Sequence, residues 1–215
     1  MSAPTVLVVA KAPVPGLAKT RVARTVGDDS AADLAAAALL DTLDAVRGSD
    51  LPAVVALTGD LSEAARSEEI VAALDAVRVV PQEGETFGDR LAQAHLDADA
   101  GHGVVQIGMD TPQVTADDLL EATALLERWP SVLGPAEDGG WWLLGVRNGR
   151  DASALTSVRM STSFTGQHTR TVLPHPVGEL RRLCDVDTWA DAQAVARQAP
   201  ASRFAAAVRA AEILA

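Results

Sequence analysis

The sequence predicts an α/β fold with a mostly parallel central sheet flanked by helices, the Rossmann-like arrangement. Short runs of apolar and β-branched residues alternate with longer alanine-rich stretches of helical periodicity, which is typical of βαβ units. The first run, residues 5–10 (TVLVVA), is apolar on both faces, as expected for a strand buried in a parallel sheet. At 215 residues, the chain 1–215 is expected to form one domain.

The predicted strands are short apolar runs, several of them bounded by glycine, proline or acidic residues. After residues 5–10, we expect strands at 53–59, 77–82, 103–110, 131–136 and 141–146. A Glu-Asp-Gly-Gly turn joins the last two of these strands.

The predicted helices are longer and periodic. They are expected at residues 30–48, 62–74, 86–99, 115–129, 188–198 and 202–214. Ser30 and Thr115 are expected N-caps, and Pro200 separates the last two helices, which make up residues 188–215. The less regular stretch 149–178 is expected to form a flap or lid.

Composition excludes several classes of protein. Hydrophobic residues make up 48% of the chain, which is ordinary for a globular protein, and the net charge of −11 disfavours a nucleic-acid binder. The single cysteine, Cys184, cannot form an internal disulfide or a cysteine-based zinc site. No apolar run approaches the roughly 18 residues that cross a membrane, and no basic segment precedes the first apolar run. We therefore expect a cytoplasmic protein that binds neither nucleic acid nor membrane.

A basic loop follows the first predicted strand, at the sheet edge where open parallel sheets bind ligands. The loop KAPVPGLAKTR contains both lysines of the chain, Lys11 and Lys19, together with Arg21. Pro13 and Gly16 stiffen and turn it. It matches neither GxxxxGK[ST] nor GxGxxG, but its cations and glycine favour a di- or triphosphate site. The alternative is a solvated basic loop.

Carboxylates follow two other apolar runs. Asp110 ends the strand predicted at 103–110, and Asp185 and Asp187 lie in CDVDT before a helix. Carboxylates and phosphates are the ligands that Mg²⁺ and Mn²⁺ prefer. We therefore expect Asp110 to bind Mg²⁺ or Mn²⁺ with one of the other two, with Asp187 favoured. The alternative is that these residues only cap turns and helices.

Two further segments offer contacts to substrates. PAEDGGWW carries Glu137 and Asp138, which can bind an acceptor or act as a general base, or simply form a hairpin turn. One of its two tryptophans is expected in the core and the other at the pocket. The expected acceptor contacts are Glu137, Asp138, Gly139, Gly140 and Trp142. In QEGETFGDRLAQA, the expected base and nucleotide contacts are Gln82, Gly84, Gly88 and Arg90, although a plain loop and helix start is the alternative.

Five motifs occur in order across almost the whole chain: AKAPVPGLAKTRVA, QEGETFGDRLAQA, GMDTPQVT, GPAEDGGWWLLGV and CDVDT. Together they resemble bacterial GT-A-fold transferases of the nucleotide-diphospho-sugar transferase superfamily, labelled as glycosyltransferases associated with radical-SAM/selenium-domain operons. The first and last motifs also resemble 2-phospholactate guanylyltransferases. The resemblance implies that Asp110 and Asp187 bind the metal, and that Lys11, Lys19 and Arg21 bind phosphates. It places Gln82, Gly84 and Gly88 near the base, and Glu137 and Asp138 beside the acceptor.

The sequence departs from this family on the acceptor side. Trp141–Trp142 replaces residues that are more often tyrosine, and Met160–Ser163 replaces a segment with a Trp-Ser pair. The identity of the acceptor is therefore not carried over, since fold alone does not fix function.

Two reactions fit these residues. Nucleotidyl transfer from an NTP to a phosphorylated small molecule, with release of pyrophosphate, is favoured by the cationic loop, with Lys19 and Asp110 at the reacting phosphates. Glycosyl transfer from an NDP-sugar is favoured by the Glu137–Asp138 pair as a base. An inactive nucleotide-binding module is the third alternative. The apolar C-terminal helices also permit a homodimer.

Overall fold

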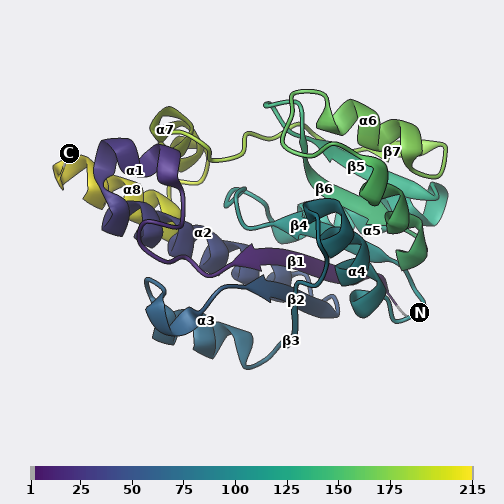
Figure 1. Cartoon of the computed structure of the whole chain (residues 1–215), viewed down its shortest axis with the longest axis horizontal. Helices are drawn as coiled ribbons and strands as arrows, with labels where there is room; N and C mark the ends of the chain where they lie inside the picture. Colours follow the sequence, from purple (N-terminus) through teal and green to yellow (C-terminus); the bar gives the residue numbers. More distant parts are fainter. Residues whose placement is uncertain (1–2, 215) are drawn as a thin grey trace.

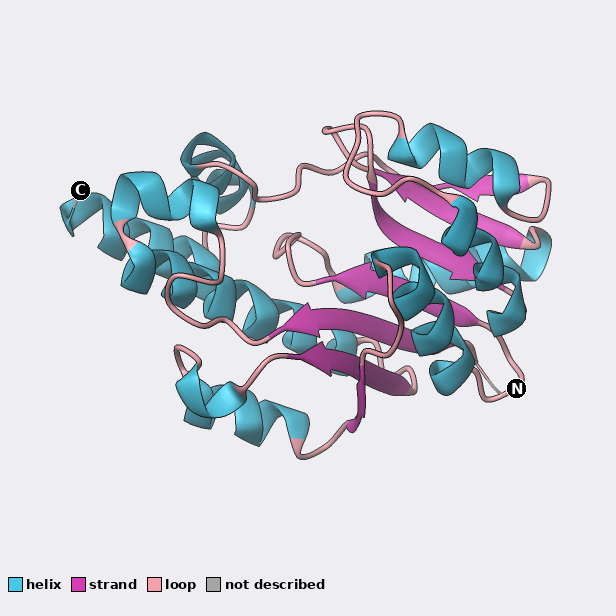
Figure 2. Cartoon of the chain, in the orientation of Figure 1, coloured by secondary structure: helices cyan, strands magenta, loops and turns pink. Residues whose placement is uncertain are grey.

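The computed structural model describes residues 3–214 and contains a seven-stranded sheet in the order β3-β2-β1-β4-β6-β5-β7 (Figures 1 and 2). The strands are β1 Thr5–Lys11, β2 Ala53–Thr58, β3 Arg78–Pro81, β4 Val104–Gly108, β5 Ser131–Pro135, β6 Trp141–Val146 and β7 Val177–Glu179. The pairs β1–β2, β2–β3, β1–β4 and β5–β7 are parallel, whereas β6 runs antiparallel to β4 and β5. The predicted α/β fold with a mostly parallel sheet is confirmed.

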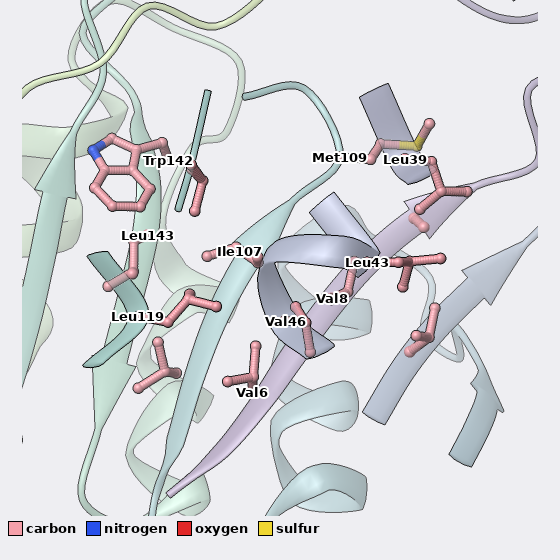
Figure 3. Close-up of a cluster of buried hydrophobic side chains, with 14 of the residues drawn as sticks. Val6, Val8, Leu39, Leu43, Val46, Ile107, Met109, Leu119, Trp142 and Leu143 are labelled. Atoms are coloured by element: carbon pink, nitrogen blue, oxygen red, sulfur yellow. The ribbon is translucent and has the colours of Figure 1, made fainter. Parts of the chain in front are cut away.

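Helices cover both faces of the sheet. Their bounds are α1 Thr20–Val26, α2 Asp28–Gly48, η1 Leu61–Glu63, α3 Ser67–Leu74, α4 Phe87–Ala98, α5 Ala116–Arg128, η2 Gly149–Ser157, α6 Thr165–Val172, α7 Trp189–Gln198 and α8 Arg203–Leu214. Strand β1 is apolar on both sides because both of its faces are covered by helices. Val6 and Val8 pack in the core under α2 and α5 (Figure 3). Leu7 packs on the opposite face against α4.

The dimer prediction assumed that the last two helices have exposed apolar faces. In the structure, most of their described apolar side chains are buried instead. Helix α8 packs along α2, and Phe204 and Val208 are buried in a second core with Leu34 of α2 and Val195 of α7. Figure 1 shows α1, α7 and α8 gathered at one end of the molecule, beside α2. The apolar residues that suggested a dimer surface are therefore largely satisfied within the chain.

Several boundaries differ from the prediction for local reasons. Ser30 is not an N-cap, because α2 begins two residues earlier and is preceded by Gly27. The helix predicted at 62–74 is divided into η1 and α3 by Arg66, whose φ of 51° is left-handed and whose guanidinium binds Asp33 at 2.6 Å. The cap at Thr115 is confirmed, since its hydroxyl and the Asp118 carboxylate form a capping box.

The stretch 149–178 is more regular than the predicted flap. It contains η2, α6 and β7, and β7 adds a parallel strand beside β5. At three residues, β7 is too short to show an alternating pattern in the sequence. Helix η2 packs closely on α4, where Leu91 and Leu155 share one cluster.

No helix within residues 3–214 combines the length and apolar character that a membrane-spanning segment requires.

A buried histidine on α4 makes stability depend on pH. The His95 ring is fully buried, its Nδ1 lies 2.8 Å from the Leu91 carbonyl oxygen, and burial lowers its pKa to about 4. In an unfolded chain the pKa is about 6.5, so between these values the unfolded state binds more protons and stability falls as pH falls. As the pH falls across this window, the free energy of unfolding of wild type should decrease by about 3 kcal/mol more than that of His95→Leu.

Urea unfolding at a series of pH values between about 4 and 7 measures this difference between the two proteins. The control is His102→Gln, because His102 is exposed. Its pH profile should match that of wild type. Parallel profiles for wild type and His95→Leu would contradict the assignment.

Candidate active site

Two adjoining cavities open where β1 and β4 end. The smaller, about 260 Å³, is lined by the loop after β1 and the start of α1. The larger, about 560 Å³, extends over the sheet toward α4, the β5–β6 turn and the segment before α6. Four residues line both cavities: Arg21, Met109, Asp110 and Asp187. The site lies at the carboxyl edge of the parallel strands, as the fold predicts.

All three predicted cations line the smaller cavity. The Lys11 side chain is exposed, and its Nζ lies 3.1 Å from the Leu17 carbonyl oxygen. Lys19 is the N-cap of α1 and has a left-handed conformation (φ 47°). Its Nζ lies 2.5 Å from Asp110 Oδ1 and donates to the Val186 carbonyl. Arg21 lies 3.1 Å from Asp187 Oδ2.

The three cations differ in how exposed their side chains are, and this difference suggests different roles. The Lys19 side chain is 9% exposed and committed to Asp110, whereas the Arg21 side chain is 68% exposed. Lys11 and Arg21 can therefore reach a ligand directly, and Lys19 can balance charge at Asp110. In the loop between them, Pro13 is buried and accepts a backbone hydrogen bond from Ala65, while Gly16 turns the chain with a φ of 76°.

The predicted carboxylates come together beside Lys19. The Val186 backbone N–H donates to the Asp110 carbonyl at 2.9 Å, which holds the segment with Asp185 and Asp187 at the end of β4. Asp185 is largely buried, and burial together with the charges of Asp110 and Asp138 raises its pKa to about 7. The site thus has a local excess of negative charge that a cation would offset.

The oxygen donors of this cluster fit a hard divalent ion such as Mg²⁺ or Mn²⁺. Within residues 3–214, however, no group of three His, Cys, Asp or Glu side chains could hold a metal ion by itself. A metal here would need further oxygen ligands, and the phosphates of a nucleotide in the adjacent cavity are suitable donors.

The β5–β6 turn places one of its two acidic residues at the site. Asp138 lines the larger cavity, and its Oδ1 accepts a hydrogen bond from the Gly140 backbone at 2.7 Å. Glu137 is exposed and is not among the residues that line either cavity. Gly139 accepts a backbone hydrogen bond from Gly166 at 2.8 Å, which ties the turn to α6.

Trp141 and Trp142 both line the larger cavity, but neither side chain is fully exposed. Trp142 is 2% exposed and belongs to the main core (Figure 3). Its indole N–H donates to the Arg181 carbonyl at 2.9 Å. Trp141 donates to Thr169 Oγ1 at 3.1 Å and is half-buried. Trp142 therefore acts first as a core residue.

The residues predicted near the base have structural partners. The Gln82 side-chain amide donates to the carbonyls of Ala10 and Ala56, at 2.7 and 2.9 Å, and so joins its loop to β1 and β2. A Cβ on Gly84 would lie 2.7 Å from the Arg90 backbone nitrogen, and one on Gly88 would lie 2.5 Å from the Leu155 oxygen. These glycines allow close packing at the start of α4.

None of these four residues is among those lining the two cavities. Arg90 instead lies over the Phe87 ring, at 5.6 Å from its centroid. Contacts of Gln82, Gly84, Gly88 and Arg90 with a nucleotide remain a prediction.

The cysteine beside the carboxylates is not activated. Burial and the nearby charges of Asp191 and Glu137 raise the pKa of Cys184 to about 11. Since a thiolate is the reactive form, this thiol is protonated at neutral pH.

The segment 160–163, placed on the acceptor side by the resemblance, lines the larger cavity, whereas the sequence alone missed Val9, Phe87, Gln106 and Thr165. Gln106 had a visible signal, since it is a polar residue inside the otherwise apolar strand VVQIG. The others lie on different elements, and only the packing of α4 and η2 against the sheet brings them together.

The fold is that of nucleotide-donor transferases. The chain aligns over its full length with 97% of a protein from Desulfovibrio desulfuricans G20, described as a "putative nucleotide-diphospho-sugar transferase", at 27% identity and a TM-score of 0.86. Rv0371c from Mycobacterium tuberculosis H37Rv, in a complex with manganese, is 21% identical with a TM-score of 0.54, over 89% of this chain and 97% of that one. A cytidylyltransferase from Leptospira borgpetersenii is 14% identical with a TM-score of 0.58, over 99% and 95%.

The chain belongs to a family described as uncharacterized proteins conserved in bacteria (DUF2064), whose model matches residues 35–162. No curated protein matches it in sequence. The expected membership in a bacterial family with this transferase fold is confirmed.

Proposed function

We propose that this protein is a divalent-metal-dependent transferase that binds the phosphates of a nucleotide donor in the smaller cavity and an acceptor in the larger one. The observation that carries the proposal is the meeting of the two cavities at Asp110 and Asp187, with exposed cations on the donor side. Donor and acceptor bound in this way would meet beside the carboxylates. The similarity to nucleotide-donor transferases supports the same assignment.

The favoured reaction is nucleotidyl transfer from an NTP to a phosphorylated small molecule. A phosphate oxygen of the acceptor forms a bond to the α-phosphorus, the bond from that phosphorus to the bridging oxygen breaks, and pyrophosphate leaves with the electron pair. Lys11 and Arg21 would bind the departing phosphates and hold them in line, and Lys19 would keep Asp110 oriented.

Asp110 and Asp187, with Asp185 beside them, would hold the metal. A bound Mg²⁺ or Mn²⁺ would neutralise charge on the reacting phosphates, which is the main catalytic requirement of phosphoryl chemistry. The manganese complex of Rv0371c supports a metal site within this fold.

Glycosyl transfer from an NDP-sugar is the second candidate, and the position of Asp138 favours it. Its carboxylate lines the larger cavity and can accept the proton of an acceptor hydroxyl, whereas a phosphate nucleophile needs no base. The description of the Desulfovibrio protein points the same way.

Product analysis separates the two reactions. The protein is incubated with each NTP and a set of sugar phosphates, and separately with each NDP-sugar and a set of alcohols, always with Mg²⁺ or Mn²⁺. Pyrophosphate from one NTP, dependent on metal and acceptor, would support nucleotidyl transfer. Nucleoside diphosphate released only from an NDP-sugar would overturn it in favour of glycosyl transfer.

Lys11 and Arg21 should contribute more to the binding of an NTP than to the binding of an NMP. Lys11→Ala and Arg21→Ala should each weaken NTP binding about 5- to 20-fold, because each removes a charge-assisted contact in a solvated site. Binding of the matching NMP should change less than about threefold, since its single phosphate lies away from these side chains.

Calorimetric titration with each nucleotide in the presence of Mg²⁺ measures both effects. The matched control is Arg24→Ala, because Arg24 lies on the same helix α1, is exposed, and is not among the residues lining the smaller cavity. It should leave both affinities unchanged. Equal weakening of NTP and NMP by Arg21→Ala would place this arginine elsewhere on the ligand.

A further inference from the structure

The larger cavity contains a buried amide with an unused hydrogen-bonding atom. Gln106 lies in the middle of β4, is 3% exposed and lines this cavity. Its Oε1 is buried and has no hydrogen-bond partner within residues 3–214. Such an atom destabilises a free protein, because it loses its hydrogen bonds to water and gains none in return.

The neighbours of Gln106 on the strand show that an apolar residue would suit this position. Val105 and Ile107 are fully buried and pack in the core on the opposite face of the sheet. On the cavity side, Val9, Phe87 and Met160 line the same space as Gln106. Burial of an unpaired polar side chain among these groups destabilises the protein, and a ligand that forms a hydrogen bond with it would offset this loss of free energy.

We propose that Gln106 binds a hydroxyl group of the molecule that occupies the larger cavity. A hydroxyl both donates and accepts, so it can pair with either end of an amide. The apolar lining from Val9, Phe87 and Met160 fits an uncharged, apolar body around that hydroxyl.

The inference rests on the proposed function only in calling this molecule the acceptor. Its reacting group would face Asp110 and Asp187, and its hydroxyl-bearing end would lie against Gln106. Gln106 would then select among acceptors without taking part in the chemical step.

Phenol and anisole are suitable probes, because they differ by one methyl group that replaces the hydroxyl hydrogen. We expect wild type to bind phenol about three- to tenfold more tightly than anisole, as one hydrogen bond to a buried amide allows. In Gln106→Met, which has a similar length and shape without the amide, this preference should disappear. Ligand-observed NMR titration measures both affinities.

The control is Gln93→Met, the same substitution on α4, where Gln93 donates to Asp97 and is not among the residues lining the cavity. It should keep the preference for phenol. In wild type itself, phenol should shift the side-chain amide resonance of Gln106 more than anisole does, which tests the contact even if Gln106→Met folds poorly.

Equal affinity for the two probes would overturn the proposal. So would a preference that survives in Gln106→Met, or the absence of binding at the solubility limit of each probe. These outcomes are independent of turnover. If the protein prefers phenol but catalyses no metal-dependent transfer, the hydroxyl site is supported and the proposed reaction is refuted. If it catalyses the transfer but shows no preference for phenol, only the hydroxyl site is refuted.

Discussion

Asp110→Asn is expected to remove almost all metal-dependent turnover while leaving the fold intact. Asp110 lines both cavities, as Asp187 does, and its Oδ1 lies 2.5 Å from Lys19 Nζ. Donor, acceptor and metal would therefore meet beside it. The substitution removes one negative charge with almost no change of shape. We expect turnover to fall by about 10²- to 10³-fold, the usual effect of removing one charge-stabilising group from an active site.

Thermal unfolding supplies the first check on this variant. The Asp110 side chain is 52% exposed, so Asn should be tolerated, and the melting temperature without ligand should stay near that of wild type. The increase in melting temperature that a nucleotide and Mn²⁺ produce together should be lost. Full turnover or an unchanged response to metal in Asp110→Asn would remove Asp110 from the site.

Asp75→Asn is the matched control for charge. Asp75 is exposed after the end of α3 and is not among the residues lining either cavity. It should retain turnover and the response to metal. A comparable loss in this variant would mean that overall charge, and not the position of Asp110, determines activity.

Gly139→Ala is expected to produce the largest structural effect of a single methyl group. Gly139 has a φ of 91°, and a Cβ at this position would lie 2.1 Å from the Ser163 carbonyl oxygen. The turn with Asp138 and the segment before α6 would have to separate, although both line the larger cavity. We expect a loss of about 2–4 kcal/mol in stability, from backbone strain together with overpacking.

Gly101→Ala separates these two contributions. Gly101 has a similar φ of 88°, but a Cβ there would have no described atom within 4 Å. This variant should therefore lose only the strain of the left-handed conformation, about 1–2 kcal/mol. Urea unfolding measures both free energies. Equal losses in the two glycine variants would show that the contact with Ser163 contributes nothing.

The architecture was predictable because its signals are local. The apolar run at β1, the N-cap at Thr115 and the break at Pro200 each depend on neighbouring residues in the sequence. Helix α1 was missed, because its N-cap is Lys19 in a left-handed conformation, which the residue pattern does not predict. Strand β7 was missed because it is three residues long and depends on pairing with β5.

The candidate site was predictable only in part. The rule that ligands bind where parallel strands end predicted the place of Lys19 and Asp110, and Asp187 lines the smaller cavity with them. The glycines at 84 and 88 fitted a base-binding loop equally well in sequence, but each accommodates close packing against a neighbouring segment of backbone. Such contacts depend on tertiary packing, which the local pattern does not contain.

A thermal-shift comparison of the four NTPs and a panel of NDP-sugars, each with and without Mg²⁺ or Mn²⁺, shows which nucleotide donor the protein binds and whether binding needs a metal. We expect one NTP to raise the melting temperature only in the presence of metal. At about 100 times its dissociation constant the stabilisation should be about 3 kcal/mol, or roughly 5–10 °C. An effect of NDP-sugars alone would replace nucleotidyl with glycosyl transfer. No shift with any nucleotide and metal would contradict a nucleotide-donor transferase.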